Sequence, residues 1–506
     1  SPACRFGFID KTERRRPDSN RCIKVLQTSP LPLGYGATLK LRYQKSFLFA
    51  SEYDTFRHMS TRLSAQVLLV QPPVYDFSLY DLYLKPYGLY RIADWFAASG
   101  YTVSLLDCLD WEEPVTQSRL GPVKRKAAGT GYIHQQEVEH PYRDQIGLQR
   151  PYYRYGILKE VVRQRISNSR PDIICITTGM TYWYQGVWEV LEVIREMHPE
   201  VPVVIGGIYA TLLPDHLRSR FPEAVISRGS GLHTIRKVLE DCGLPVGDAP
   251  LKNHPDIIPG RWKASAVVRM HEGCPCSCDY CASQLLAKEF IPGDPIEMLR
   301  WVERLKSTTG ITNIAWYDDA LLVHKQRGII PFLEELLRRK LMLRFYTPNG
   351  LHIDHIDSYT ASLMNRSGFQ EIRLGFESAS DAFHQSHDQK TSLEQLKQAL
   401  EHLRSGGFSP QQIRVYLLAG LPGQHWEEVC ETLNQVCALG IRVSIAEYSP
   451  VPETALWLES CRISPYPLCD EPLFHNNSIQ PVSWQHFTRE DMNRLKDSSR
   501  RYSGSL

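Results

Sequence analysis

The sequence predicts an α/β protein with an N-terminal Rossmann-like, doubly wound domain followed by a partial (β/α)6 TIM-type barrel. Two observations predict this fold class. Short apolar runs alternate with segments of helical periodicity from Gln66 to about residue 240, and a second alternation begins after the proline-bearing segment 250–259. Strands whose residues are apolar without interruption are typical of a parallel sheet covered by helices on both faces.

The first alternation predicts the doubly wound domain. Its strands are expected at 67–70, 101–106, 172–177, 201–205 and 224–227, and its helices at 89–99, 157–166 and 188–197. Gly100 fits the end of the first helix, because glycine readily adopts the left-handed conformation found there. Such a domain carries its binding site at the carboxyl ends of the strands. The polar segment 110–150 is predicted to be a long loop or insertion.

The second alternation predicts the partial barrel. Its strands are expected at 266–270, 312–317, 343–347, 371–376, 413–419 and 443–448, and its helices near 295–307, 331–340, 353–366, 391–404 and 425–438. Six strands favour an incomplete barrel over a full eight. Reactive groups in this architecture lie on the loops that follow the strands.

Domain boundaries follow from these patterns. Residues 1–58 show no sustained period and are predicted to be a disordered tail or an over-extended start, with Met59 as the natural first residue. The doubly wound domain is expected at 59–245 and the barrel at 246–460. A short C-terminal extension, with one helix near 489–498, is expected at 461–506.

Composition narrows the class of protein. The chain has 506 residues with a formal net charge of +2, so electrostatics give no reason to expect nucleic acid or an anionic membrane as a partner. No apolar run is long enough to span a membrane, and no secretory signal is visible. Most of the thirteen cysteines are scattered singly. Such spacing is poor for disulfides and favours a cytoplasmic location.

The most informative motif is a loop expected directly after the first barrel strand. Cys274, Cys278 and Cys281 have the spacing C-x3-C-x2-C. Three thiolates on a four-iron cluster would leave one iron open to bind another molecule. Zinc is the alternative, but zinc sites normally draw cysteine pairs from two separated loops, and no second C-x2-C occurs. Cys276 lies between the ligands and is assigned no role, because the pattern is complete without it; its exchange for one of the three ligands is the alternative.

The three-cysteine motif, with the aromatic Tyr280 before its last cysteine, resembles that of the radical S-adenosylmethionine (SAM) superfamily. Other segments at predicted strand ends are similar to those of the same superfamily, so that the resemblance covers about 260–455: Asp318-Asp319, Thr347–Gly350, Leu374–Ser378, Gly420–Gly423 and Glu447–Pro452. The region 66–240 resembles the cobalamin-binding domain that precedes the barrel in one branch of the superfamily.

The resemblance implies a [4Fe–4S] cluster on the three cysteines, SAM at the open iron, and a flavodoxin- or ferredoxin-type electron donor. It also implies SAM contacts after the later strands. Asp318 or Asp319 would hold the ammonium group, although many relatives have Gly-Gly-Glu there. The remaining contacts would be Asn349 at the methionine or ribose end, Glu377 and Ser378 at the ribose, and Gly420 and Tyr448 at the adenine.

Simpler interpretations stand beside these assignments. The aspartate pair could cap a helix, Asn349 and Gly420 could belong to turns, and Tyr448 could be a core aromatic. In the first domain, the aromatic run Tyr182-Trp183-Tyr184 could line a cobalamin or substrate pocket or pack against the second domain. Gly206-Gly207 is interpreted as a tight turn after a strand.

The cobalamin question leaves more than one reaction open. The chain lacks Asp-x-His-x-x-Gly, whose histidine binds cobalt in the methionine-synthase type. With cobalamin, the resemblance implies methyl transfer to an unactivated carbon of a small-molecule or peptide substrate. Without it, the implied reaction is hydrogen abstraction by a 5′-deoxyadenosyl radical. The non-enzymatic alternative is an iron–sulfur or zinc protein whose metal stabilises the fold or relays electrons.

Overall fold

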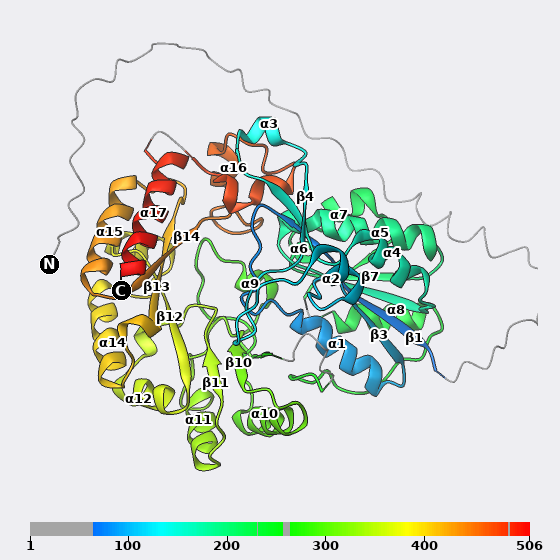
Figure 1. Ribbon diagram of the computed structural model, residues 1–506, viewed down its shortest axis with the longest axis horizontal. Helices are drawn as coiled ribbons and strands as arrows, with labels where there is room; N and C mark the ends of the chain where they lie inside the picture. Colours follow the sequence, from blue (N-terminus) through cyan, green and yellow to red (C-terminus); the bar gives the residue numbers. More distant parts are fainter. Residues whose placement is uncertain (1–63, 230, 257–263, 484–485, 506) are drawn as a thin grey trace, which may run out of the picture. The chain divides into compact units, whose positions relative to one another are not determined.

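The protein is described here by a computed structural model that covers residues 64–229, 231–256, 264–483 and 486–505. The predicted tail 1–58, Met59 and residues 257–259 of the proline-bearing segment lie outside the described residues. Within them the chain forms two parallel sheets and one small antiparallel sheet (Figure 1).

The first parallel sheet confirms the predicted doubly wound domain. Its strand order is β3-β1-β6-β7-β8, and every neighbouring pair is parallel. The strand order therefore switches from one side of β1 to the other, with β3 on one side and β6 on the other. Sheets of this kind bind ligands in the crevice outside the carboxyl ends of the strands at such a switch point, here β1 and β6. The bounds are β1 (Gln66–Gln71), β3 (Thr102–Asp107), β6 (Ile173–Thr178), β7 (Val203–Gly207) and β8 (Val225–Ile226).

Helices cover both faces of this sheet. Leu68 and Val70 of β1 pack in one apolar core with helices α4 and α5, whereas Val67 and Leu69 pack in a second core with α1 and α8. The uninterrupted apolar run of β1 follows from this burial on both sides. The helices are α1 (Tyr87–Ala98), α4 (Lys159–Ser167), α5 (Tyr184–Met197), α6 (Ile208–Leu212), α7 (Pro214–Arg220) and α8 (Leu232–Asp241), with the 3-10 turn η1 (Thr181–Trp183).

The segment 110–150 is more ordered than the loop that its polarity predicts. It contributes the strand β4 to an antiparallel sheet of order β2-β5-β4, in which β2 is far from the other two strands in the sequence. The side chains of β4 are alternately exposed and half-buried, so its residues are mostly polar and do not show the apolar run that would predict a strand. The elements are β2 (Val74–Asp76), α2 (Pro114–Leu120), β4 (Gln135–Val138), α3 (Arg143–Ile146) and β5 (Tyr152–Tyr155).

The second parallel sheet confirms the predicted partial barrel. Its order, β14-β13-β12-β11-β10-β9, follows the chain from one edge to the other, and all its pairs are parallel. Each predicted strand is present within a few residues. The bounds are β9 (Ala266–Val268), β10 (Asn313–Trp316), β11 (Arg344–Tyr346), β12 (Phe369–Glu377), β13 (Ile413–Ala419) and β14 (Arg442–Glu447).

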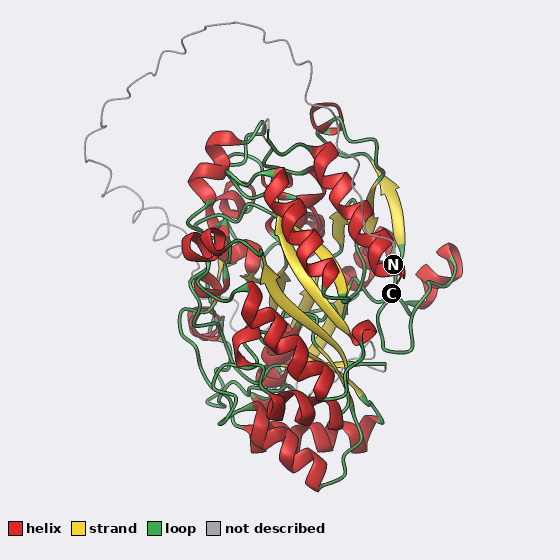
Figure 2. Ribbon diagram, turned by 90° about the vertical axis from the view of Figure 1, so that its left-hand side faces the viewer, coloured by secondary structure: helices red, strands yellow, loops and turns green. Residues whose placement is uncertain are grey.

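The longer crossover helices α10, α11, α12, α14 and α15 pack on the outer side of this sheet, whereas the short α9 follows the cysteine loop and contacts α6 (Figures 1 and 2). Their ends follow capping chemistry: the Asp294 carboxylate accepts bonds from the first amides of α10, and Gly310 ends that helix in the left-handed conformation. The helices are α9 (Ser283–Leu286), α10 (Pro295–Thr309), α11 (Ile329–Arg338), α12 (Ser358–Arg366), α13 (Asp381–His387), α14 (Leu393–Ser405) and α15 (Trp426–Ala438), with the 3-10 turns η3 (Ile353–His355) and η4 (Pro410–Gln412).

The C-terminal extension joins both domains. Helix α17 covers the edge strand β14, where the Ser503 hydroxyl accepts a bond from the Val443 amide at 3.0 Å and the Ser499 hydroxyl donates to the Val443 carbonyl at 3.0 Å. An edge strand covered in this way cannot pair with another chain. The elements are α16 (Trp457–Ile463), η5 (Pro472–His475), η6 (Asn477–Ile479) and α17 (Arg489–Ser505).

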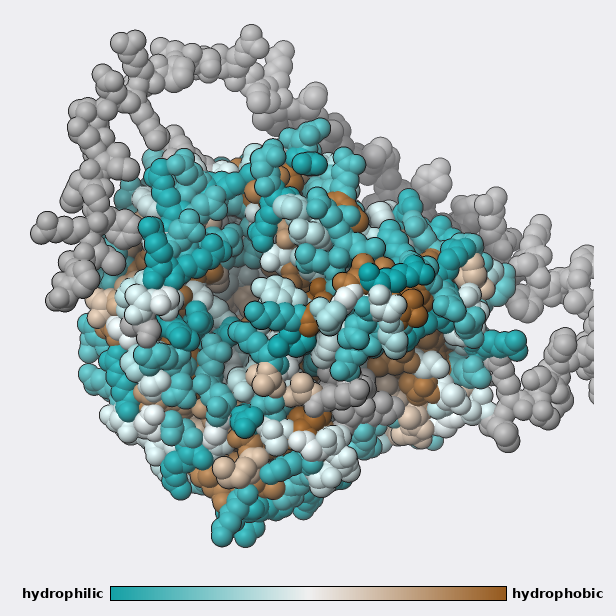
Figure 3. Space-filling model, viewed as in Figure 1, coloured by the Kyte–Doolittle hydropathy of each residue, from teal (hydrophilic) through white to brown (hydrophobic). Residues whose placement is uncertain are grey.

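The surface agrees with the composition. The face in Figure 3 is largely hydrophilic, with scattered apolar patches. No helix in the described ranges has the length and apolar character that a membrane crossing requires.

The contact between α17 and the barrel gives a stability prediction. Leu495 is on the buried face of α17 and is 1% exposed, so Leu495→Ala should lower the free energy of unfolding by about 2–5 kcal/mol through lost burial and the cavity it leaves. The neighbouring Arg494→Ala, which removes only an exposed ion pair with Glu490, should cost at most about 0.5 kcal/mol. Thermal and urea unfolding measure both; equal losses would contradict this packing.

Candidate functional site

The candidate site is built on the loop that leaves β9, and a buried carboxylate fixes where that loop starts. The Asp318 carboxylate accepts backbone hydrogen bonds from Met270 at 2.9 Å and from His271 at 2.7 Å. Farther along, Glu272 and Ile291 exchange a pair of backbone bonds of 2.9 Å each. The cysteines therefore lie on a loop whose base is closed and whose first residues are held to the neighbouring strand end.

The four cysteines of this loop differ in their surroundings. Cys278 is buried, Cys274 and Cys276 are partly buried, and Cys281 is exposed. Burial raises the pKa of the Cys278 thiol to about 11, against the opposing effect of the nearby Lys390 ammonium. The pKa of Cys274 is raised to about 12, first by its hydrogen bond with Cys276 and then by burial.

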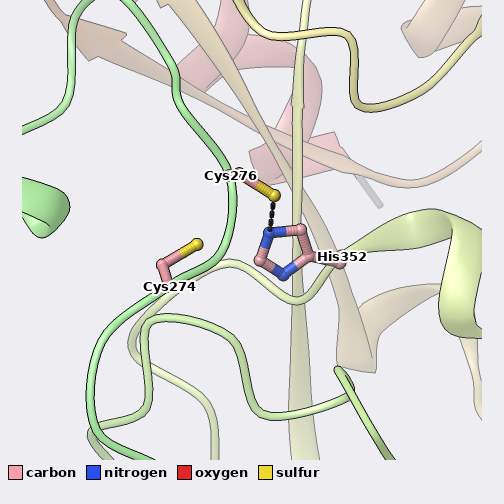
Figure 4. Close-up of side chains that lie close together, drawn as sticks. All are labelled: Cys274, Cys276 and His352. Atoms are coloured by element: carbon pink, nitrogen blue, oxygen red, sulfur yellow. Dashed lines mark hydrogen bonds between the residues drawn. The ribbon is translucent and has the colours of Figure 1, made fainter. Parts of the chain in front are cut away.

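A histidine that sequence reasoning missed lies beside two of these cysteines. The Cys274 and Cys276 sulfurs and a ring nitrogen of His352 all lie within 4.8 Å of one another (Figure 4). The Cys276 sulfur is 3.5 Å from His352 Nε2. His352 belongs to the turn after β11 and has no recognisable spacing from the cysteines, so only the fold brings it there.

The donor chemistry of the loop fits two kinds of metal group. Thiolates of a four-iron cluster bind separate irons, so Cys274, Cys278 and Cys281 need not converge on one point. A single zinc ion needs its ligands close together, as Cys274, Cys276 and His352 are. The three motif thiols on one anchored loop fit a [4Fe–4S] cluster, and the compact set gives the zinc alternative a structural basis.

A polar chain joins the cysteine loop to the end of β12. The Tyr280 hydroxyl donates to Asp388 at 2.8 Å, and Asp388 is 2.7 Å from His384 Nδ1. The other ring nitrogen of His384 lies 2.7 Å from the Ser378 carbonyl oxygen. Because Asp388 and His384 are buried, this chain fixes α13 and the tyrosine between the last two motif cysteines together.

Glu377, at the end of β12, has unusual backbone and electrostatic properties. Its φ is +68°, in the left-handed region that residues other than glycine rarely adopt. Burial raises the pKa of its carboxyl to about 7, although Lys390 acts in the opposite direction. Strained backbone combined with a perturbed carboxyl is common at functional sites.

The aspartate pair is divided between two environments. Asp318 is 3% exposed and holds backbone amides, so its carboxylate does not face solvent. Asp319 is exposed to solvent, but neighbouring protein atoms displace part of the water around its carboxyl. This partial desolvation raises the pKa of the carboxyl. Asn349 is exposed, and its side-chain amide donates to the Tyr317 and Asp318 carbonyls at 3.2 Å each.

The other predicted contacts are largely structural in this conformation. The buried Ser378 hydroxyl accepts a bond from the Ser380 amide at 3.1 Å. Gly420, with φ +94°, donates its amide to the Gln424 side chain at 2.8 Å. Tyr448 is a core aromatic whose hydroxyl lies 3.0 Å from that of Ser460. A cavity of about 250 Å³ opens beside them, lined by Ser380, Ala382, Phe383, His387, Leu421–Gln424 and Glu428.

In the first domain, the predicted aromatic run lies directly after β6, beside the switch point in the strand order. The Trp183 indole donates at 2.7 Å to Asp76, which is buried and also accepts a bond from Asn476 at 2.9 Å. Gly207, the last residue of β7, has φ +100°, and a side chain there would collide with the Thr178 backbone. The buried Ser227 hydroxyl has no hydrogen-bond partner among the described residues.

Comparison with known families identifies both domains. Residues 268–436 match the radical SAM superfamily and residues 145–239 match the B12 binding domain. The chain thus carries a radical SAM domain preceded by a B12-binding domain, which confirms the resemblance drawn from the sequence. A radical SAM domain implies a [4Fe–4S] cluster and SAM. Both matches fall inside the domains predicted at 59–245 and 246–460.

Individual relatives are distant. An anaerobic magnesium-protoporphyrin IX monomethyl ester cyclase of Rubrivivax gelatinosus is 21% identical over 313 residues, covering 54% of this chain and 55% of that protein. A second cyclase of the same description, from Cereibacter sphaeroides, is 22% identical over 342 residues, covering 59% of this chain and 55% of that protein. The chain thus spans about half the length of these curated relatives.

One solved structure matches nearly the whole fold. The radical SAM methyltransferase TsrM from Kitasatospora setae, with tryptophan substrate and aza-SAM bound, has a TM-score of 0.61 at 14% identity over 86% of this chain and 90% of TsrM. At this identity the likeness establishes the two-domain fold.

The buried Asp318 predicts a pH effect on stability. Burial raises its carboxyl pKa from 3.8 to about 7. The folded state therefore favours the protonated carboxyl, which adds to the free energy of unfolding. This added stability is fully present below about pH 4 and is lost as the pH rises through 7. Asp318→Asn cannot titrate, and it leaves one backbone amide without an acceptor at a cost of about 1–3 kcal/mol.

Melting temperatures measured from pH 5 to pH 8.5 check this prediction. Asp318→Asn should melt below the wild type at pH 5, and the difference should shrink toward pH 8. The exposed Asp497→Asn serves as the control and should follow the wild type throughout. A constant gap between Asp318→Asn and the wild type would show that Asp318 does not titrate in this range.

Proposed function

We propose that this protein is a radical SAM enzyme that holds a [4Fe–4S] cluster through Cys274, Cys278 and Cys281. The observation that carries the proposal is the C-x3-C-x2-C loop at the carboxyl end of β9, on a base fixed by Asp318, within a matched radical SAM domain. When bound, the cluster supplies one electron that cleaves SAM into methionine and a 5′-deoxyadenosyl radical. A flavodoxin- or ferredoxin-type protein is the proposed electron source, and a reducing cytoplasm the proposed location.

The surrounding residues are proposed to hold SAM, with roles adjusted to their positions. Asp319 is the better candidate for the ammonium group, because the Asp318 carboxylate already accepts two backbone bonds. The Asn349 side-chain amide is used to bind the Tyr317 and Asp318 carbonyls, so its side-chain oxygen is the atom proposed to contact the methionine or ribose end of SAM. Glu377 is proposed to accept a hydrogen bond from a ribose hydroxyl, since its carboxyl lies at the carboxyl end of β12 in a protein-enclosed position.

Ser378, Gly420 and Tyr448 are proposed to shape the ribose and adenine end of the pocket. Their polar side-chain or amide groups are already used within the protein, so they would act mainly through backbone position and shape. The 250 Å³ cavity between α13 and the turn Leu421–Gln424 offers space next to them.

We further propose that the first domain binds cobalamin in the crevice between β1 and β6, and that the reaction is methyl transfer to a small-molecule or peptide substrate. The matched B12-binding domain, the aromatic residues after β6 and the tight approach of Gly207 to Thr178 support this. If the domain holds no cobalamin, the reaction becomes hydrogen abstraction at the substrate.

A second candidate function follows from the compact set of Cys274, Cys276 and His352. These three ligands are close enough for one zinc ion, which would make the loop a structural metal site without catalysis. Cys276 and His352 distinguish the two candidates, because the cluster proposal uses neither.

Substitution of single cysteines tests the enzyme proposal. After anaerobic reconstitution with iron and sulfide, the wild type should bind about four irons per chain and form 5′-deoxyadenosine or S-adenosylhomocysteine when given dithionite and SAM. Cys278→Ala should lose this product by a factor of about 100 or more, because one thiolate ligand is gone. The matched control Cys276→Ala should stay within a few-fold of the wild type.

The zinc alternative predicts the opposite pattern. A colourless protein whose zinc is lost in Cys276→Ala and His352→Ala but kept in Cys278→Ala would sink the enzyme proposal.

Growth with hydroxocobalamin tests the cofactor of the first domain. The wild type should purify with cobalt and a cobalamin absorption spectrum. Trp183→Ala should weaken retention about tenfold, the scale of a lost aromatic contact, whereas Met342→Ala at a 77% exposed barrel position should not. If the protein forms 5′-deoxyadenosine but never retains cobalt, the proposal of radical chemistry stands and the proposal of cobalamin-dependent methyl transfer is wrong.

A further inference from the structure

Two cysteines outside the candidate site lie in contact. Cys461 is on α16, and Cys469 is in the turn that follows this helix. The Cys469 thiol donates to the Cys461 sulfur across 2.7 Å. Cys469 is exposed, whereas Cys461 is partly buried against the apolar cluster that contains Leu468 and Phe474.

Other cysteines of the chain show how this pair differs. Cys108 and Cys175 are enclosed in apolar cores at 0% and 4% exposure, and Cys242 lies alone on the surface after α8. Disulfide exchange needs an accessible thiol to attack and a second thiol within bonding reach. Cys469 and Cys461 meet these two requirements.

We propose that Cys461 and Cys469 form a reversible disulfide by exchange with small-molecule disulfides such as oxidised glutathione. The exposed Cys469, as its thiolate, attacks one sulfur of the oxidant, and one small thiol leaves after taking up a proton. Cys461 then loses its proton and attacks the Cys469 sulfur, releasing the second small thiol. The protein dithiol is oxidised by two electrons, and the small disulfide is reduced to two thiols.

The order of these two steps follows from the surroundings of the pair. Burial is the main cause that raises the pKa of Cys461, to about 12, so Cys461 is a poor first nucleophile. Once Cys469 carries the small thiol, the adjacent Cys461 needs to move little to displace it. Cys469 is therefore the entry thiol and Cys461 the resolving thiol.

The disulfide would constrain the segment 464–480, which contacts the first domain. In this segment Glu471 accepts bonds from Tyr142 at 2.8 Å and Tyr184 at 3.0 Å, and Asn476 donates to Asp76. A covalent link between α16 and Cys469 fixes the start of this segment, and so reduces its freedom to open. Oxidation would in this way stabilise contacts next to the crevice between β1 and β6.

Peptide mapping tests the proposal on the full-length, cluster-loaded protein, equilibrated anaerobically in glutathione buffers of increasing oxidation. Trypsin separates the two cysteines into peptides 443–462 and 463–489, because Arg462 lies between them. The expected result is a cross-linked peptide pair that appears in oxidising buffer and disappears with dithiothreitol. Both thiols should lose their reaction with an alkylating agent in the same buffers.

Single variants test the assigned order. Cys461→Ser should accumulate a glutathione adduct at Cys469, whereas Cys469→Ser should accumulate little at Cys461. Cys242→Ser is the matched control and should leave the cross-link unchanged. Hydrogen exchange of residues 471–476 should slow in the oxidised wild type and not in either serine variant.

Two outcomes would overturn the proposal. The first is undiminished alkylation of both cysteines at every glutathione ratio. The second is oxidation that joins Cys274 to Cys276 and leaves peptides 443–462 and 463–489 separate. The iron content of the same samples reports cluster binding by the motif cysteines separately, so failure here is distinguishable from failure of the proposed function.

Discussion

The bond between a buried carboxylate and two backbone amides is the constraint on which the candidate site depends. Asp318 receives the amides of Met270 and His271, where the chain leaves β9. Without an acceptor these buried amides would carry a large desolvation cost, so the loop is held to this path. Asn349 extends the connection to β11 by donating to the Tyr317 and Asp318 carbonyls. Three successive strand ends are thereby joined by hydrogen bonds beneath the cysteines.

A second set of contacts connects the same loop to the far part of the sheet. Tyr280, Asp388 and His384 form a chain of short bonds that ends on the Ser378 carbonyl. Glu377, one residue before, has the left-handed backbone that directs the chain into this turn. The proposed cluster ligands and the proposed ribose-binding residue are therefore positioned by one network, so a change in α13 would affect both.

The two domains meet through the C-terminal extension as well as through the chain connection. The Asp76 carboxylate accepts hydrogen bonds from Trp183 of the first domain and from Asn476 of the extension. Helix α17 of the same extension covers the barrel edge strand β14. The segment 464–480 between them carries the contacts that the Cys461–Cys469 pair would stabilise. An extension that looks like a tail in the sequence thus packs against both sheets.

The sequence by itself determined the two parallel sheets and the three-cysteine motif, because apolar periodicity and ligand spacing are local properties of the chain. Only the tertiary structure decided which polar side chains are bonded within the protein and which are accessible to bind a ligand. Asp318 and Asp319 are adjacent and chemically identical in the sequence, yet one is buried on backbone amides and the other accessible. His352 beside Cys276, the β2-β5-β4 sheet and the contact of Cys461 with Cys469 likewise arise from distant segments. No local pattern records such pairings, because they depend on where the packed sheets bring the ends of their strands and loops together.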